Sequence, residues 1–157
     1  MKHLVLSSIA VAALLLSGCS KKTPEADTTS TSDADRLAAL ASQIQSEVGT
    51  VYFDFDKFNI KGDMQPVINT NAGLFNQADA QNLSVKVEGN CDEWGTDEYN
   101  YALGLKRAKA AKDALVKQGV NADRIMVVSY GESNPVCTDK SKACDAQNRR
   151  AEFKVLP

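Results

Sequence analysis

An acidic turn and an arginine further along the chain are the residues whose types and spacing best suit chemistry. The turn spans Gly89–Gly95 and holds Asp92, and Arg107 follows on a segment with helical periodicity. A carboxylate and a guanidinium carry opposite charges, so a fold that brings them together can bind both charges of a ligand. On spacing alone two other interpretations stay open: the two side chains pair with each other, or Asp92 helps to cap the helix.

Few other chemistries are available to this chain. The only histidine, His3, lies near the N-terminus, which leaves the rest of the chain without imidazole for catalysis or zinc binding. Lys and Arg total 18 against 20 Asp and Glu, so no basic excess favours nucleic acid. A calcium site is the alternative for the acids Asp92, Glu93, Asp97 and Glu98. Acids at a helix N-terminus are ordinary complements of its dipole, so neither a metal nor a cofactor is expected.

Strands and helices alternate from residue 50 to residue 157, which we expect to form one folded domain. Alternating apolar residues predict four strands, at Val51–Phe55, Leu83–Glu88, Ile125–Tyr130 and Ala151–Val155. Helices are expected between the first three strands, over Asp63–Ala78 and Thr96–Gln118. This order predicts an α+β fold of the type β-α-β-α-β-β, with a mixed four-stranded sheet and helices packed on one face.

The second of these helices has the clearest boundaries. Thr96 can cap its N-terminus, and Gly119 can end it. Its apolar face is expected to consist of Leu105, Ala108, Ala111 and Leu115.

The N-terminus indicates export. A short basic region precedes the apolar run Leu4–Leu16, which is too short to span a bilayer and predicts a signal peptide over residues 1–18. The Leu-Ser-Gly-Cys sequence that ends at Cys19 resembles a lipobox and predicts lipidation of that cysteine, the alternative being an ordinary cleavage site. Ser20, where sorting signals for the inner membrane have Asp, favours the outer membrane. We therefore expect a lipid-anchored protein of the cell outer membrane that faces the periplasm.

Residues 19–49 are expected to form a lipidated, flexible tether. The segment from residue 20 to 35 has no large apolar side chain with which to offset the entropy of ordering. A short amphipathic helix between Asp33 and Gly49 is predicted by four apolar residues at helical spacing, Leu37, Leu40, Ile44 and Val48. This helix could pack on the domain or against a partner.

The cysteines predict one disulfide. Cys137 and Cys144 flank the short polar loop Thr138–Ala143, and an exported chain matures in an oxidising compartment. Since Cys19 is expected to carry lipid, Cys91 is left as the odd thiol. The alternative is that Cys137 and Cys144 are two free thiols in a mobile loop.

The acidic turn and the helix after it are similar to a known signature. The pattern G-N-x-D-x-x-G-x4-N-x2-L-x3-R-A starts at Gly89 and resembles that of OmpA C-terminal-like domains, most closely the peptidoglycan-associated lipoproteins. Supporting matches lie at Val51–Lys57, Val128–Glu132, Pro135 and Asn148–Ala151. The sequence departs from the family pattern at Asn90, where histidine is common, and at Cys91, where threonine or alanine is common.

The resemblance implies binding to the cell wall. Members of the family bind the peptide stem of peptidoglycan, often at diaminopimelate, whose side-chain end carries an ammonium and a carboxylate on one carbon. Asp92 would meet the ammonium, and the planar fork of Arg107 would take the carboxylate through two hydrogen bonds. Three further positions match residues that line the same pocket in the family, namely Asp56, Thr96 and Leu103.

The resemblance also implies partners. Tol proteins are expected, TolB foremost and TolA as a second candidate, and the chain is expected to tether rather than to catalyse. The alternative from another class is a peptidoglycan-modifying hydrolase that uses a pair of carboxylates from Asp54, Asp56, Asp92 and Glu93.

Overall fold

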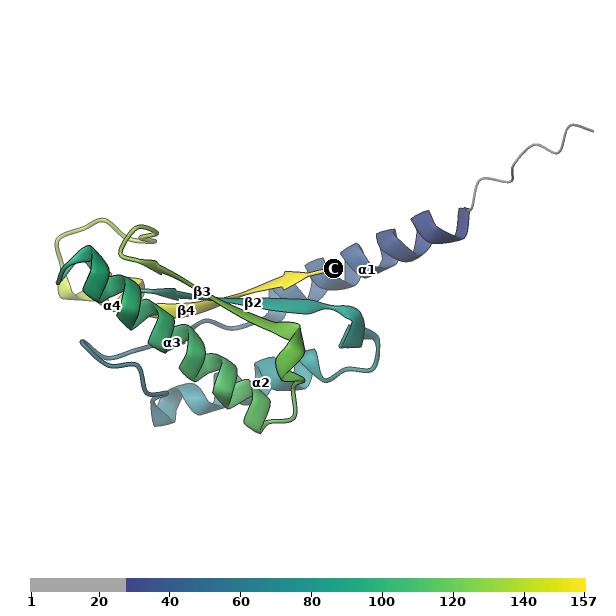
Figure 1. Ribbon diagram of the computed structural model, residues 1–157, viewed down its shortest axis with the longest axis horizontal. Helices are drawn as coiled ribbons and strands as arrows, with labels where there is room; N and C mark the ends of the chain where they lie inside the picture. Colours follow the sequence, from purple (N-terminus) through teal and green to yellow (C-terminus); the bar gives the residue numbers. More distant parts are fainter. Residues whose placement is uncertain (1–27) are drawn as a thin grey trace, which may run out of the picture.

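The computed structural model describes residues 28–157, and their side chains from Ser32 onward. The predicted signal peptide and the lipidation site Cys19 lie outside the described residues. Within the described part, no helix is both long enough and apolar enough to cross a membrane. The described chain consists of a domain and a helix, α1, that extends from one end of it (Figure 1).

Four strands form one mixed sheet. In the spatial order β1-β4-β2-β3, they are β1 (Val51–Tyr52), β4 (Arg150–Leu156), β2 (Ser84–Asn90) and β3 (Ile125–Gly131). A helical crossover lets β2 and β3 run parallel, whereas β4 lies antiparallel to both β2 and β1. The predicted α+β class with a mixed four-stranded sheet is confirmed. The first strand is shorter than the expected Val51–Phe55, because the chain leaves the sheet after Phe53 donates its N–H to Arg149.

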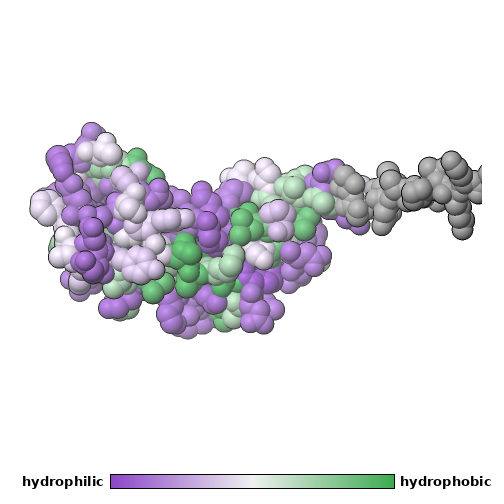
Figure 2. Space-filling view, turned by 45° about the horizontal axis from the view of Figure 1, so that its top comes forward, coloured by the Kyte–Doolittle hydropathy of each residue, from purple (hydrophilic) through white to green (hydrophobic). Residues whose placement is uncertain are grey.

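Two helices, α2 (Gln65–Phe75) and α3 (Asp97–Lys117), contribute side chains to a core shared with the sheet (Figure 1). The core includes Ile68 and Phe75 from α2, Ala111 and Leu115 from α3, and alternate residues of the strands. Short 3-10 turns occupy residues 62–64, 79–82 and 122–124. The face in Figure 2 is mostly hydrophilic, with hydrophobic residues in smaller groups among them.

The expected apolar face of α3 is wrong at one position. Leu105 is 39% exposed, whereas Leu103 is buried. The cause is Gly104, which faces β2 so closely that a Cβ on Gly89 would lie 1.8 Å from the Gly104 carbonyl oxygen. Successive residues of a helix point in directions about 100° apart around its axis. Because Gly104 faces the sheet, Leu105 points away from it.

Helix α1 (Thr28–Glu47) begins upstream of the expected cap Asp33 and takes in part of the segment expected to be a tether. No proline or glycine interrupts the chain there, so the helix can extend toward the N-terminus. Its C-terminal end packs on the domain, since Ile44 is buried in the core. The side chain of Gln45 donates to the carbonyl of Phe153 at 3.0 Å and accepts from the N–H of Val155 at 2.8 Å. These hydrogen bonds pair backbone groups of β4 at positions where the short strand β1 no longer lies beside it.

The connection between β3 and β4 contains a helix that the sequence did not predict, α4 (Lys142–Asn148). Ser141 caps it by accepting a hydrogen bond from the N–H of Cys144 at 3.2 Å. The predicted disulfide between Cys137 and Cys144 is confirmed, and Cys91 is a free, buried thiol, as expected. The disulfide ties α4 to the loop that precedes it.

Candidate functional site

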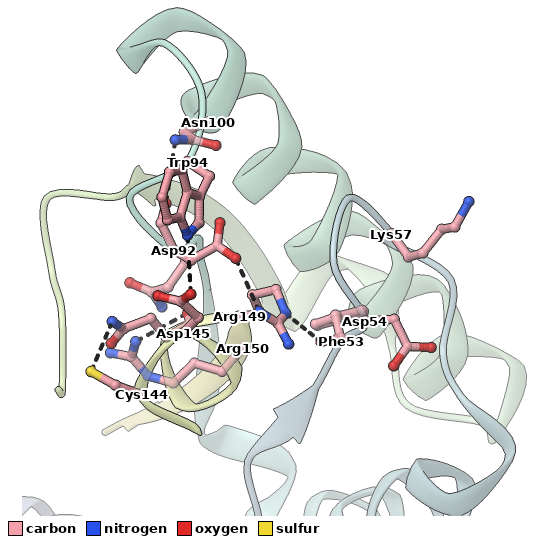
Figure 3. Close-up of polar contacts among 12 residues, drawn as sticks. Phe53, Asp54, Lys57, Asp92, Trp94, Asn100, Cys144, Asp145, Arg149 and Arg150 are labelled. Carbon is pink, nitrogen blue, oxygen red and sulfur yellow. Dashed lines mark hydrogen bonds and ion pairs between the residues drawn. The ribbon is translucent and has the colours of Figure 1, made fainter. Parts of the chain in front are cut away.

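The carboxylate of Asp92 lies at the exit of β2 in an ion pair that the sequence did not predict. Asp92 is 3% exposed, and its Oδ2 lies 3.0 Å from Nη1 of Arg149. Arg149, between α4 and β4, also donates through Nε to the carbonyl of Phe53 at 3.1 Å (Figure 3). This arginine therefore joins the exits of β1 and β2, and it holds Asp92 in one orientation.

Arg107 lies on the inner face of α3 and is fully buried. Its guanidinium donates to three backbone carbonyls: Nε to Lys57 at 2.9 Å, Nη1 to Asn90 at 2.8 Å and Nη2 to Asp54 at 3.2 Å. It also lies over the ring of Phe53, 5.3 Å from the centroid. The interpretation that Asp92 and Arg107 form an ion pair with each other is not what the structure shows.

The charge of Arg107 has no direct counter-ion. Among residues 32–157, no carboxylate oxygen lies within 4 Å of its guanidinium nitrogens, and burial lowers the pKa of this group. The carboxylates of Asp92 and Asp56 attract this charge only from beyond ion-pair distance, and the loss of hydration on burial outweighs their attraction. Such a site is electrostatically prepared for an anion.

The turn after β1 covers Arg107 and contains Asp56. Asp56 adopts a φ of 56°, in the left-handed region that non-glycine residues rarely occupy. The hydroxyl of Tyr99 donates to the Asp56 carboxylate, and this hydrogen bond raises the pKa of Tyr99. Thr96 caps α3 by accepting from the N–H of Tyr99 at 3.2 Å, so Tyr99 connects two of the predicted site residues. Leu103 is buried one helical turn before Arg107.

A cavity of about 410 Å³ opens beside the pair of Asp92 and Arg149. Its lining consists of Phe55, Trp94, Lys142, Asp145 and Arg149. The Nε1 of Trp94 donates to Asp145 at 3.0 Å, which fixes the indole against α4 (Figure 3). None of these residues was predicted from the sequence to belong to the site. Two signals were present in the sequence: Trp94 is the only tryptophan and lies in the acidic turn, and Arg149 belongs to a matched motif.

The residues at the two departures from the family pattern are both buried. The side-chain amide of Asn90 donates to the carbonyl of Glu88 at 3.1 Å, and the backbone carbonyl of Asn90 accepts from Arg107. The thiol of Cys91 lies 3.3 Å from the carbonyl of Asn100, and burial raises its pKa to about 11. Both residues stabilise the exit of β2 from which Asp92 projects.

Two of the four acids proposed for calcium meet different cations. Asp92 pairs with Arg149, and Glu93 pairs with Lys140 on the loop before α4. Within the described residues, no three acidic, cysteine or histidine side chains are grouped as metal ligands.

Comparison with known proteins identifies the family. The sequence pattern of the OmpA family matches residues 52–149, which run from the last residue of β1 to the residue after α4 and include Asp92 and Arg107. The chain belongs to the OmpA family. Its membership confirms the expected fold and places both residues inside the matched region.

Relatives with the same domain are named peptidoglycan-associated lipoproteins. One from Pasteurella multocida is 44% identical over 108 residues, which cover 69% of this chain and 71% of that protein. Another from Mesorhizobium japonicum is 39% identical over 145 residues, 90% of this chain and 85% of that protein. The crystal structure of the peptidoglycan-associated lipoprotein from Burkholderia pseudomallei gives a TM-score of 0.65 at 37% identity, over 68% of this chain and 89% of that one. The resemblance found in the motifs is confirmed.

Proposed function

We propose that this chain binds the peptide stem of peptidoglycan non-covalently and tethers the outer membrane to the cell wall. The observation that carries the proposal is the buried guanidinium of Arg107, which lacks a counter-ion and lies at the same strand exit as the carboxylate of Asp92. An anion and a cation thus lie at the same strand exit, and one ligand would meet both once the turn around Asp56 moves. The names of the relatives, peptidoglycan-associated lipoproteins, support the same substrate.

The ligand that fits these charges is the side-chain end of diaminopimelate. Its ammonium would meet Asp92, of which Oδ2 is engaged by Arg149 at 3.0 Å. Its carboxylate would accept hydrogen bonds from the guanidinium of Arg107. This group donates three of its five N–H groups to backbone carbonyls. Arg107 is fully buried. When the carboxylate binds, the segment that carries the carbonyls of Asp54 and Lys57 must therefore move, and at least one of their hydrogen bonds with Arg107 must break. The strained backbone of Asp56 makes this turn the element to move.

The remaining members of the proposed site support these charges. Asp56 and Thr96 are linked through Tyr99, which holds the turn against α3. Leu103 packs one helical turn before Arg107 and contributes apolar surface near its base.

The anchor completes the proposed function. Lipid on Cys19 would hold the chain in the outer membrane, and α1 would carry the domain toward the wall. We extend the proposal to the Tol proteins, TolB and then TolA, as partners, so that the chain acts as the wall-binding component of a Tol-Pal system in envelope integrity and cell division. The support for this last step is the resemblance to peptidoglycan-associated lipoproteins.

Co-sedimentation with purified peptidoglycan sacculi tests the proposal. Wild-type protein should pellet with sacculi and release no muropeptides, whereas a hydrolase would release them. Asp92→Asn keeps the shape of the side chain but removes its charge, so binding should weaken by about 2 to 5 kcal/mol, or tens to thousands of fold. Asp113→Asn, an exposed acid on α3 that pairs with Lys109, is the matched control. Equal pelleting of both variants would contradict the assignment.

A further inference from the structure

The strand β3 has one open side. It pairs with β2 alone, and no other strand of the described chain lies beside it. The N–H of Ile125 donates to the carbonyl of Ala122, and its own carbonyl accepts from Nζ of Lys112 at 2.6 Å. The backbone of Ile125 therefore faces away from β2, and because backbone groups alternate in direction along a strand, those of Val127 and Ser129 face the same way. Nothing in the described part of the chain takes up these outward groups, so the edge can accept a further strand.

The sequence of β3 does not block pairing at this edge. Open edges are usually protected by charged residues or proline, and β3, with the sequence Ile-Met-Val-Val-Ser-Tyr-Gly, has neither. Its ladder with β2 is regular from Ile125 to Ser129 and shifts only beyond that point. Two apolar side chains, Met126 and Tyr130, are 49% and 37% exposed. This edge is therefore suited to pairing with a second strand.

Helix α3 adds an apolar surface along the same edge. Tyr101 of α3 and Tyr130 of β3 line one hollow, and further along the helix Lys112 reaches the edge of β3. Spacings of four and seven residues put Leu105 on the same flank of α3 as Tyr101 and Lys112. Leu105 and Tyr101 are 39% and 57% exposed. Leu105, which the sequence pattern placed in the core, is thus part of a second apolar surface.

Charged groups of opposite sign lie at the two ends of this surface. Lys112 and Arg124 lie at the start of β3, and Asp97, Glu98 and Glu132 lie around its end. In the part of the chain whose side chains are described, none of the five forms a salt bridge. A two-fold axis through the middle of β3 reverses a second copy, so that its acidic end meets the basic end of the first. The charge pattern of this surface is therefore self-complementary.

We propose that a second copy of this chain binds at β3, by antiparallel pairing of the two β3 strands about a two-fold axis at Val128. Val127 then lies opposite Ser129 of the second copy, and each of the two symmetric pairs exchanges two backbone hydrogen bonds. Val128 lies opposite its own counterpart. Met126 lies opposite Tyr130, where a thioether can contact an aromatic ring. The interface joins two sheets into one and goes beyond the proposed function, since it needs no wall ligand.

An extended segment of another protein is a poorer occupant of this edge. Such a segment could pair with the outward backbone groups of Val127 and Ser129. It would leave the flank of α3 around Leu105 uncovered, and it has no reason to carry acids and bases in the order that this surface requires. A second copy supplies the strand, the apolar flank and the complementary charges together, and we therefore assign the edge to it.

Cysteine cross-linking in cells tests the register of this pairing. Val128→Cys puts two thiols at a non-hydrogen-bonded pair, where the Cα atoms lie about 4.5 Å apart, within the span of about 4.4 to 6.8 Å that a disulfide allows. This variant should migrate as a covalent dimer on a non-reducing gel. Met126→Cys is the matched control. Its position is the more exposed of the two, but it lies about 13 Å along the strand from its counterpart and should not cross-link.

Second substitutions separate the interface from accidental oxidation. Leu105→Glu, added to Val128→Cys, puts a charge into the apolar flank and should weaken association at least about ten-fold. Tyr52→Glu, at the opposite edge of the sheet and 38% exposed, should leave the cross-link unchanged. Melting curves of the reduced variants show whether each keeps the fold.

Four results would overturn the inference. They are the absence of a covalent dimer of Val128→Cys, equal cross-linking of Val128→Cys and Met126→Cys, a cross-link that is insensitive to Leu105→Glu, and cross-linking of Val128→Cys to a different protein only. The last result would assign the edge to that protein. None of them bears on the wall site at Asp92, because the pairing of β3 does not depend on peptidoglycan.

Discussion

Replacing Arg149 with methionine removes the cation that faces Asp92 and leaves most of the side-chain volume in place. The carboxylate of Asp92 is 3% exposed, so it would remain buried without its direct ion-pair partner. Breaking a buried ion pair from one side typically costs about 3 to 5 kcal/mol. The side chain of Arg149 is 15% exposed, which places the expected loss near the lower end, at about 3 kcal/mol.

The loss can be measured as a shift in the melting temperature. An unfolding entropy of about 2.1 cal/mol/K per residue, over about 130 ordered residues, converts 3 kcal/mol into a shift of about 11 °C. Thermal unfolding followed by circular dichroism should give this value for Arg149→Met. The double variant Asp92→Asn/Arg149→Met should recover part of the loss, since the buried position then holds a neutral amide.

The control is a salt bridge whose two side chains are exposed rather than buried. Lys109 and Asp113 pair at 2.7 Å on the outside of α3, with side chains 67% and 50% exposed. Lys109→Met should shift the melting temperature by about 2 °C or less. If Arg149→Met melts together with Lys109→Met, the pair with Asp92 does not organise the site as described here.

The cysteines give three further predictions. Cys19 should carry lipid, so cells fed a clickable fatty acid should yield labelled protein, and a Cys19→Ser variant should stay unlabelled. Loss of the disulfide in Cys137→Ser/Cys144→Ser should lower the free energy of unfolding by about 2.5 kcal/mol in the chain-entropy model, measured by denaturant titration. Cys91, with a pKa raised to about 11, should react slowly with iodoacetamide at pH 8 and faster as the pH rises from 9 to 11, because its thiol is protonated at pH 8 and the reactive thiolate forms only as the pH approaches the pKa. Fast alkylation of folded protein at pH 8 would contradict the burial of this thiol.

The regular elements were predictable where one local signal dominated. The alternation of apolar residues in β2 and the cap at Thr96 locate a strand and a helix without tertiary information. Helix α4 escaped prediction because it is short, polar and held by the disulfide and by the Ser141 cap rather than by an apolar face. The exposure of Leu105 depends on a close approach between two glycines, which periodicity does not encode.

The sequence supplied candidate residues for the site but not their contacts. The family motif identifies Asp92 and Arg107, and the structure brings both to the exit of β2. The sequence does not reveal that Arg149, distant along the chain, takes the place beside Asp92. It also does not reveal that the turn around Asp56 supplies carbonyls to Arg107. Both contacts join segments that only the folded sheet brings together.

Competition for sacculi with two stem peptides tests most directly whether Asp92 and Arg107 together recognise one carbon that bears both an ammonium and a carboxylate. The first peptide is L-alanyl-γ-D-glutamyl-meso-diaminopimelate, and the second has L-lysine as its third residue, whose side chain ends in an ammonium alone. The wild-type protein should be released from sacculi by the diaminopimelate peptide and retained in the presence of the lysine peptide, because the guanidinium of Arg107 would then lack its anion. Equal release by both peptides would contradict recognition of the carboxylate by Arg107.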